Sequence, residues 1–117
     1  MMDKVTFSFG KNWQFFLKNF NQERIRAAEL SLKEFLDIEN LHEKGFLDIG
    51  CGSGLFSYAA YNLGASKIVS FDMDPISIQC CQSLHHQAGN PMNWEIFQGS
   101  VCDEMFINKL GTFDIVY

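Results

Sequence analysis

The chain has 117 residues, enough for one domain, and 47% of them are hydrophobic while 20% are charged, so a packed core is feasible and a disordered chain is excluded. The net charge is −5 and no block of basic residues occurs. A nucleic-acid backbone would therefore find little electrostatic attraction here, and we expect no nucleic-acid partner.

The first predicted elements are helices. Apolar and aromatic side chains recur at close to helical spacing over residues 12–20 and again over residues 21–36, where Asn21 is the expected N-cap. Together with the residues around them, these segments form a predicted helical lead-in over residues 1–43.

A series of strands and helices follows the lead-in. The apolar run from Phe46 to Ile49 ends in a glycine cluster, which is typical of a buried parallel strand followed by a tight turn. Asp74 and Pro75 have the residue types of an N-cap and a first helical position. The predicted elements are a strand at 46–49, a helix at 55–63, a strand at 68–71, a helix from 75 to about 88, a strand at 94–97 and a strand at 113–117.

This alternation predicts an α/β fold over residues 44–117. Strands that alternate with helices form βαβ units and a mostly parallel sheet, here of the Rossmann-like, doubly wound kind. In such a sheet, ligands bind beyond the carboxyl ends of the strands, where the order of the strands reverses. The turn after the first strand lies at that point.

The glycine turn itself separates two ligand classes. Gly50, Gly52 and Gly54 allow the backbone to bend sharply and to approach a ligand closely, as in many nucleotide sites. The dinucleotide fingerprint G-x-G-x-x-G requires a third glycine at the place of Leu55, and Asp48 would repel a pyrophosphate. A carboxylate before the turn suits a cationic ligand instead, although Asp48 as a strand-end residue satisfied by backbone N–H groups remains an alternative.

Further candidate residues follow the second and third strands. Asp72 lies 22 residues after Gly50, the offset at which an acidic residue meets ribose hydroxyls, and Met73 is suited to lie against an adenine face. Asp103 is a candidate acceptor for the adenine amino group, with the Cys102 N–H on a ring nitrogen. The alternatives are a turn residue at Asp72 and a helix cap at Asp103.

The ordered series of motifs resembles the class I S-adenosylmethionine-dependent methyltransferases. Residues 46–54 resemble their first motif, residues 69–75 their second, residues 99–103 their adenine-side motif and residues 113–117 their fourth-strand motif. Ser100 departs from the family pattern, because many relatives carry an acidic residue there. The resemblance implies S-adenosylmethionine as cofactor, bound by Asp48, Gly50, Cys51, Gly52, Ser53, Gly54, Asp72, Met73, Val101, Cys102 and Asp103.

The resemblance also implies an activity and a domain plan. We expect methyl transfer by in-line displacement to a small-molecule acceptor, with residues 44–117 as the S-adenosylmethionine-binding domain. The lead-in also resembles that of a bacterial methyltransferase subgroup, and Lys11 and Trp13 become candidates for a lid over cofactor and acceptor. Family sheets have seven strands and carry their catalytic residues after the fourth, so we expect a C-terminally truncated chain without catalytic residues of its own.

Two other functions stay open from the sequence. One is a cofactor-binding or interaction domain without catalysis, and the other is an NAD-dependent oxidoreductase, which Leu55 and Asp48 disfavour. None of the four cysteines forms a Cys-x-x-Cys pair, so we expect free thiols and no bound metal. With no secretory signal and no stretch near the ~20 apolar residues that span a bilayer, we expect a cytoplasmic protein without a membrane partner.

Overall fold

The computed structural model describes residues 22–100 and 102–117. The predicted helix over residues 12–20, the Asn21 cap, the lid candidates Lys11 and Trp13, and the site candidate Val101 lie outside the described residues. Those predictions therefore stay predictions.

The described chain begins with a helix over residues 22–36, called the leading helix below. Its further elements are β1 (Gly45–Ile49), α2 (Leu55–Asn62), β2 (Lys67–Asp72), α3 (Pro75–Gln87), β3 (Trp94–Gln98), α4 (Glu104–Lys109) and β4 (Ile115–Val116). The bounds predicted for the second lead-in helix, the first three strands and the two helices between them agree to within one residue, because apolar runs and glycine or proline stops mark those ends clearly.

The fourth strand is shorter than predicted. The strand itself covers Ile115 and Val116, although the sequence predicts a strand over residues 113–117. Backbone hydrogen bonds to β1 continue on both sides of it, because the Asp114 N–H donates to the Gly45 carbonyl at 3.1 Å and the Tyr117 N–H donates to the Leu47 carbonyl at 2.8 Å. The Gly45 N–H donates to the Asp114 carboxylate at 2.8 Å instead of to a backbone carbonyl. Asp114 therefore bonds to Gly45 through both its side chain and its backbone N–H, and it holds the start of the strand in place.

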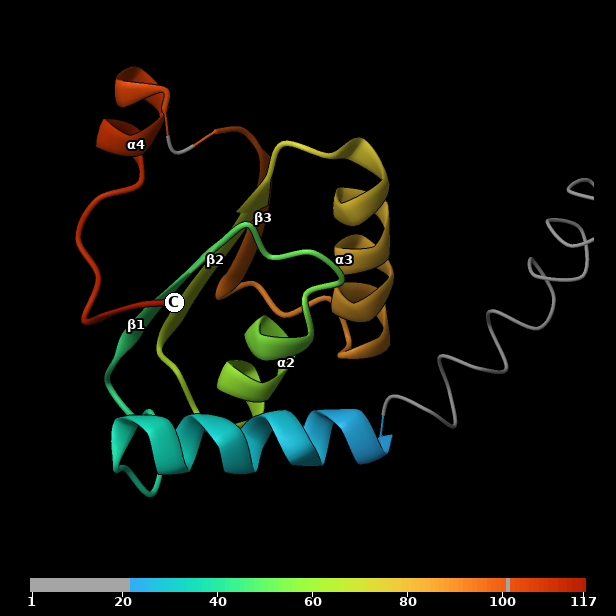
Figure 1. The fold of residues 1–117 in the computed structure, drawn as a ribbon, viewed down its shortest axis with the longest axis vertical. Helices are drawn as coiled ribbons and strands as arrows, with labels where there is room; N and C mark the ends of the chain where they lie inside the picture. The colour runs from blue at the N-terminus through green and yellow to red at the C-terminus, as the bar shows by residue number, and fades with distance from the viewer. Residues whose placement is uncertain (1–21, 101) are drawn as a thin grey trace, which may run out of the picture.

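The four strands form one parallel sheet in the order β3-β2-β1-β4 (Figure 1). The chain adds β2 and β3 on one side of β1 and then returns to add β4 on the other side. The order therefore reverses at β1, as the doubly wound prediction requires, and the turn after β1 lies at the switch point.

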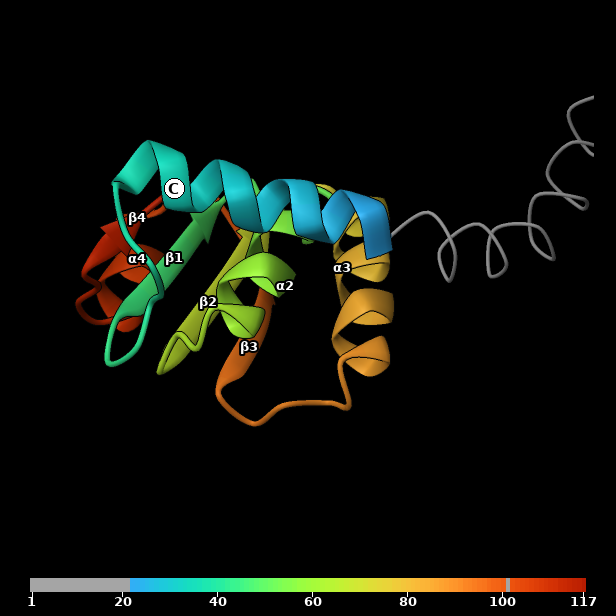
Figure 2. The ribbon, with the colours of Figure 1, turned by 90° about the horizontal axis from the view of Figure 1, so that it is seen from below.

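Helices cover the two faces of the sheet unequally. The leading helix, α2 and α3 contribute to one core cluster with Phe46, Ile68 and Trp94, which neighbour one another across the strands. The opposite face has a smaller cluster that includes Leu110, just after α4. Figure 2 shows α2 and α3 on one side of the strands and α4 on the other. Within residues 22–100 and 102–117, no helix is both long and apolar enough to cross a membrane.

The predicted start of α3 is confirmed. The Asp74 carboxylate accepts the Ile76 N–H at 3.1 Å and the Ser77 hydroxyl at 3.2 Å, and Pro75 occupies the first helical position. Capping fixes the place where the chain leaves β2 and enters the helix. As a result, Asp72 and Met73 lie in a short connection with a defined path.

Candidate functional site

The glycine turn after β1 requires its glycines for two different reasons. Gly50, Gly52 and Gly54 have φ angles of 65°, 56° and 86°, in the left-handed region that other residues rarely adopt. A Cβ at Gly50 or Gly52 would have no atom within 4 Å, whereas a Cβ at Gly54 would lie 2.6 Å from the Cys81 Sγ. The turn therefore presents a bare backbone to open space at its start and packs tightly on α3 at its end.

Asp72 connects this turn to the start of α3. One carboxylate oxygen accepts the Gly52 N–H at 3.0 Å, and the other accepts the Asp74 N–H at 2.9 Å. The turn role considered from the sequence is thus present in the structure. Each carboxylate oxygen has a second acceptor site, so these bonds leave room for hydroxyl donors from a ligand, and the ribose contact stays a prediction.

Asp48 lies beneath the turn rather than in the open. Its side chain is 4% exposed, and it accepts the Ser57 hydroxyl at 2.6 Å. Burial raises the pKa of Asp48 to about 6, the Ser57 hydroxyl acts against this rise, and the negative charge of Asp72 adds to it. We expect any influence of Asp48 on a ligand to act mainly through its charge.

Sequence reasoning missed the two serines beside Asp48. The Ser57 hydroxyl also bonds to the Ser70 hydroxyl, which in turn accepts the Trp94 indole N–H at 2.8 Å. Both serines are fully buried. The available signal was a single small polar residue inside each of two apolar segments, α2 and β2, but only the packing of α2 on the sheet shows that they meet.

Cys51 fits the turn as a small residue. A hydrogen bond with the Cys81 thiol is the main cause that raises its pKa, and burial and nearby negative charges raise it further. A protonated thiol is a poor nucleophile, so the geometry gives Cys51 no activated form. Ser53, the other non-glycine residue inside the turn, is exposed.

The predicted adenine side lies after β3. The Gly99 N–H donates to the Asp72 carbonyl at 3.0 Å, which brings this loop beside the end of β2. Met73 is 68% exposed and is available to a flat ligand. The Cys102 N–H donates to the Ser100 hydroxyl at 3.1 Å, so an adenine nitrogen would have to replace that bond. Asp103 is exposed, and its ligand contact stays a prediction.

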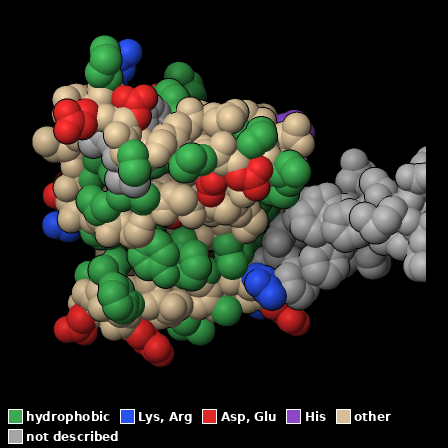
Figure 3. All heavy atoms as spheres, turned by 45° about the horizontal axis from the view of Figure 1, so that its top comes forward, with side chains coloured by type: hydrophobic (Ala, Val, Ile, Leu, Met, Phe, Trp, Pro, Cys, Tyr) green, Lys and Arg blue, Asp and Glu red, His purple; other side chains and the backbone are tan. Residues whose placement is uncertain are grey.

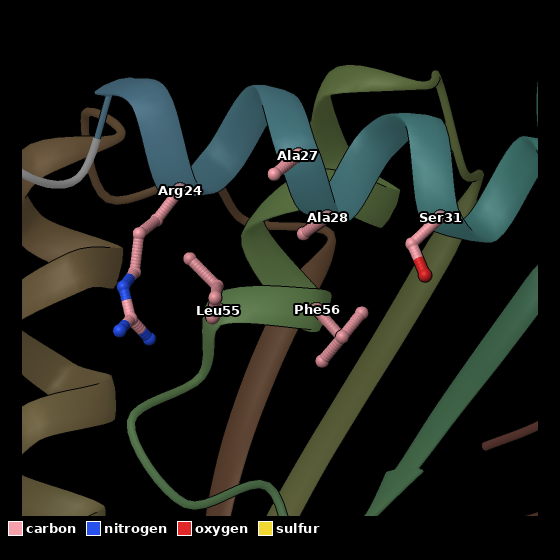
Figure 4. Close-up of a pocket in the computed structure, with 6 residues that line it drawn as sticks. All are labelled: Arg24, Ala27, Ala28, Ser31, Leu55 and Phe56. Carbon is pink, nitrogen blue, oxygen red and sulfur yellow. The ribbon is translucent and has the colours of Figure 1, made fainter.

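A pocket of about 290 Å³ lies between the leading helix and the first turn of α2 (Figure 4). In Figure 4 the Arg24 side chain extends from the leading helix past Leu55, which directly follows Gly54. The leading helix therefore lines a space beside the glycine turn. The pocket is lined by Arg24, Ala27, Ala28, Ser31, Leu55 and Phe56.

The surface around these elements is mixed apolar and acidic. Figure 3 shows hydrophobic side chains across the middle of one face, carboxylates among them, and the visible Lys and Arg side chains towards the rim. Such a surface favours a cationic ligand over a phosphate. In the part of the chain that the structure describes, no three His, Cys, Asp or Glu side chains are grouped as metal ligands would be.

Comparisons with protein families and with curated relatives agree with one another. The model of the family described as "Ribosomal protein L11 methyltransferase (PrmA)" matches residues 26–116. A ribosomal protein L11 methyltransferase of Vibrio campbellii is 32% identical over 84 residues, which cover 67% of this chain and 28% of the relative. One of Photobacterium profundum is 48% identical over 56 residues, which cover 48% of this chain and 19% of the relative. The chain spans less than a third of the length of these relatives.

Solved structures show the same fold. The C-terminal domain of precorrin-6Y C5,15-methyltransferase from Rhodobacter capsulatus has a TM-score of 0.60 at 19% identity, covering 67% of this chain and 41% of that one. A complex of Trypanosoma brucei PRMT1 enzyme and prozyme with AdoHcy has a TM-score of 0.57 at 26% identity, covering 80% of this chain and 27% of that one. These similarities confirm the predicted Rossmann-like fold.

One sequence-based expectation is wrong. The sequence led us to expect a small-molecule methyl acceptor, but the names of the relatives specify a ribosomal protein. The motifs that carried the resemblance all concern the cofactor. They contain no information on the acceptor, so the small-molecule expectation had no residue to support it.

Proposed function

The chain belongs to the ribosomal protein L11 methyltransferase (PrmA) family, and we propose that it binds S-adenosylmethionine and takes part in methyl transfer to a protein acceptor. The observation that carries the proposal is the extent of the family match. Residues 26–116 include the leading helix from Arg26 onward, the glycine turn, Asp72 and the loop after β3. The proposed site thus lies wholly within the matched segment.

The geometry of the turn fits this cofactor. Gly50 and Gly52 present open backbone where a Cβ would meet nothing within 4 Å, which leaves room for a ligand to approach. S-adenosylmethionine carries an ammonium and a sulfonium and has no phosphate, so the carboxylates Asp48 and Asp72 attract it. Asp48 would repel the pyrophosphate of NAD, and the family match also argues against that cofactor.

The bound cofactor supplies an activated methyl group on a sulfonium. The chain's own residues bind and orient the cofactor. Asp72 accepts hydrogen bonds from the ribose hydroxyls, Met73 packs on the adenine, and Asp103 accepts a hydrogen bond from the adenine amino group. The N-terminal end of α2, which begins at Leu55 directly after Gly54, faces the same space. We assign no residue of this chain to the attack on the methyl group.

The proposed acceptor is a protein, and ribosomal protein L11 is the first substrate to test because the relatives carry its name. A protein acceptor needs a larger approach surface than a small molecule does. The face of Figure 3, where hydrophobic and acidic side chains lie together, offers such a surface.

The test combines binding with transfer. We expect calorimetric titration to show binding of S-adenosylmethionine and S-adenosylhomocysteine, and none of NAD. Incubation of a protein that carries this segment at the full length of the relatives, with purified ribosomal protein L11 and cofactor labelled in the methyl group, is expected to leave label on ribosomal protein L11. Binding of NAD alone would contradict the cofactor assignment, and labelling of small molecules but of no protein would contradict the acceptor.

A matched pair of variants tests the site itself. Asp72→Asn removes a charged acceptor from the proposed diol contact and should weaken binding of both ligands by about tenfold or more. Asp74→Asn makes the same chemical change two residues later, where Asn caps a helix as well as Asp does, and should leave binding unchanged. Equal effects of the two variants would remove Asp72 from the site.

A further inference from the structure

A row of hydrogen-bonded side chains crosses the core beneath the glycine turn. Asp48 of β1 and Ser70 of β2 are register partners, and Ser57 of α2 lies over both of them. Trp94 of β3 reaches Ser70 from the other side. Four elements that are separate in the sequence thus contribute one side chain each, and we call these four residues the Trp94 relay.

The hydrogen bonds of the relay all run in one direction, from donor to acceptor, starting at Trp94 and ending at Asp48. An indole N–H can only donate, so the Ser70 oxygen accepts the Trp94 hydrogen and the Ser70 hydroxyl hydrogen is left for Ser57. The Ser57 hydroxyl donates to the Asp48 carboxylate. Each bond therefore orients the next, and the sequence of donors ends on the charged group, where hydrogen bonds strengthen one another.

Packing alone does not explain this arrangement, because it lowers the stability of the fold. All four side chains are at most 4% exposed, and a buried carboxylate costs free energy that an apolar residue of similar size would not. The charge that acts on Asp48 is the like charge of Asp72, and the neighbouring Cys51 is a neutral thiol. Within the described residues, the stabilisation of the Asp48 charge comes from Ser57, through both its hydroxyl and its backbone N–H, and the relay orients the hydroxyl.

We propose that Trp94, Ser70 and Ser57 are positioning residues that keep the Asp48 carboxylate charged and fixed beneath the glycine turn, where its charge attracts the cationic cofactor. This inference rests on the proposed function, because it needs a cofactor with net positive charge. It assigns an indirect role in binding to Ser57 and Trp94, which lie outside the four motifs, and to Ser70, which lies within the second motif.

The relay predicts a pH dependence of binding with a definite sign. Burial raises the pKa of Asp48 to about 6, while the Ser57 hydroxyl holds it lower than burial alone would. Above that pH the carboxylate is charged and attracts the cofactor, and below it the attraction is lost. Removal of a donor raises the pKa further, so the loss of binding moves towards neutral pH.

The test uses a pair of variants with the same shape. Ser70→Thr and Ser70→Val give side chains of the same shape and size, but threonine keeps the hydroxyl and valine has a methyl group in its place. Ser57→Ala removes the direct donor, and Ser83→Ala is the control, since the Ser83 hydroxyl bonds to the Gln79 carbonyl on the exposed side of α3. Each variant of the 117-residue chain is titrated with S-adenosylmethionine and with S-adenosylhomocysteine between about pH 5 and about pH 8.

We expect the affinity of the original chain for S-adenosylmethionine to fall as the pH drops through about 6. Ser57→Ala should move this midpoint upward by about one pH unit, and Ser70→Val should move it by about half a unit. Ser70→Thr and Ser83→Ala should keep the original midpoint. S-adenosylhomocysteine lacks the sulfonium charge and should show a weaker dependence on pH throughout.

Other outcomes separate the two proposals. In one outcome, S-adenosylmethionine binds, but the pH midpoint of binding is the same in Ser57→Ala and Ser70→Val as in Ser70→Thr. The relay then has no role in binding, and the proposed function stands. If the original chain binds neither ligand at any pH, both proposals fail. Carboxyl NMR of the unliganded chain measures the pKa of Asp48 directly, and an unchanged pKa in a folded Ser70→Val variant would also overturn the relay.

Discussion

The two faces of the sheet differ in how they are filled, although the same four strands form both. Side chains alternate along β1, so Phe46 and Asp48 point to the face covered by helices, whereas Leu47 points to the other. The first face holds a large cluster built from the leading helix, α2, α3 and the strands. Among the side chains that the structure describes, the second holds four buried residues, namely Leu47, Val69, Phe71 and Leu110.

The difference shows where stability and binding are combined. The larger face carries both the main apolar core and the buried Asp48 charge, and the glycine turn packs on it through Gly54. Packing there fixes the proposed site, so a loss of core volume on that face should disturb both folding and binding. The opposite face should affect folding alone.

The largest expected effect compares the same substitution on the two faces. Leu32→Ala removes a fully buried side chain from the leading helix and should lower the free energy of unfolding by about 4 kcal/mol. Leu110→Ala on the opposite face should lower it by about 2 kcal/mol, because the smaller cluster there relaxes more easily. Urea unfolding measures both, and a larger loss for Leu110→Ala would reverse the proposed ranking of the faces.

The second prediction compares the two ends of the glycine turn. Both Gly50→Ala and Gly54→Ala place an alanine in the left-handed region, which costs about 1 kcal/mol. At Gly54 the added methyl also meets Cys81, and the total should reach about 3 kcal/mol. Thermal unfolding gives these values.

The Cys81 contact has its own control. Cys81→Ala removes the Sγ atom that lies 2.6 Å from the added methyl, so the double variant with Gly54→Ala should be more stable than the sum of the single changes predicts. Additive losses would show that backbone strain, rather than the contact with α3, makes Gly54 necessary.

The smallest effect concerns the buried charge of the larger face. The pKa of Asp48 lies at about 6 in the folded chain and at 3.8 ordinarily, so the folded chain binds this proton more tightly than the unfolded chain does. Asp48 therefore costs stability increasingly as the pH rises from about 4 to about 6. Asp48→Asn should raise the free energy of unfolding at neutral pH by about 2 kcal/mol and change it little below about pH 4. A loss of stability at neutral pH would show that the charge holds the fold together.

Most of the fold could be predicted because local features mark it. The apolar run before Gly50 and the Asp74-Pro75 pair each fix an element boundary by their own chemistry. The short β4 was not predictable in this way. Its start depends on a bond between Asp114 and Gly45, 69 residues apart, which no window of sequence contains.

The candidate site was predictable to the extent that motifs define it. Asp72 and the three glycines lie together at the switch point, as their order in the chain indicates. Ser57 and Ser70 were not found, because a serine in an apolar segment is common. The role of Ser70 depends on the register between β1 and β2, and the role of Ser57 depends on the packing of α2 on those strands. The burial of Asp48 could not be predicted either, because a carboxylate at the end of a strand can point outward or lie beneath the following helix.

The bond between Gly45 and Asp114 also has a consequence for the time course of folding. β1, β2 and β3 join through neighbouring βαβ units, whereas β4 reaches β1 only by closing a separation of 69 residues. During synthesis, the helix-covered face can therefore assemble while Asp114 is still within the ribosome. β1 therefore gains its second neighbouring strand last. Until β4 pairs with it, one edge of β1 is exposed, and a nascent chain can pair there with the wrong partner.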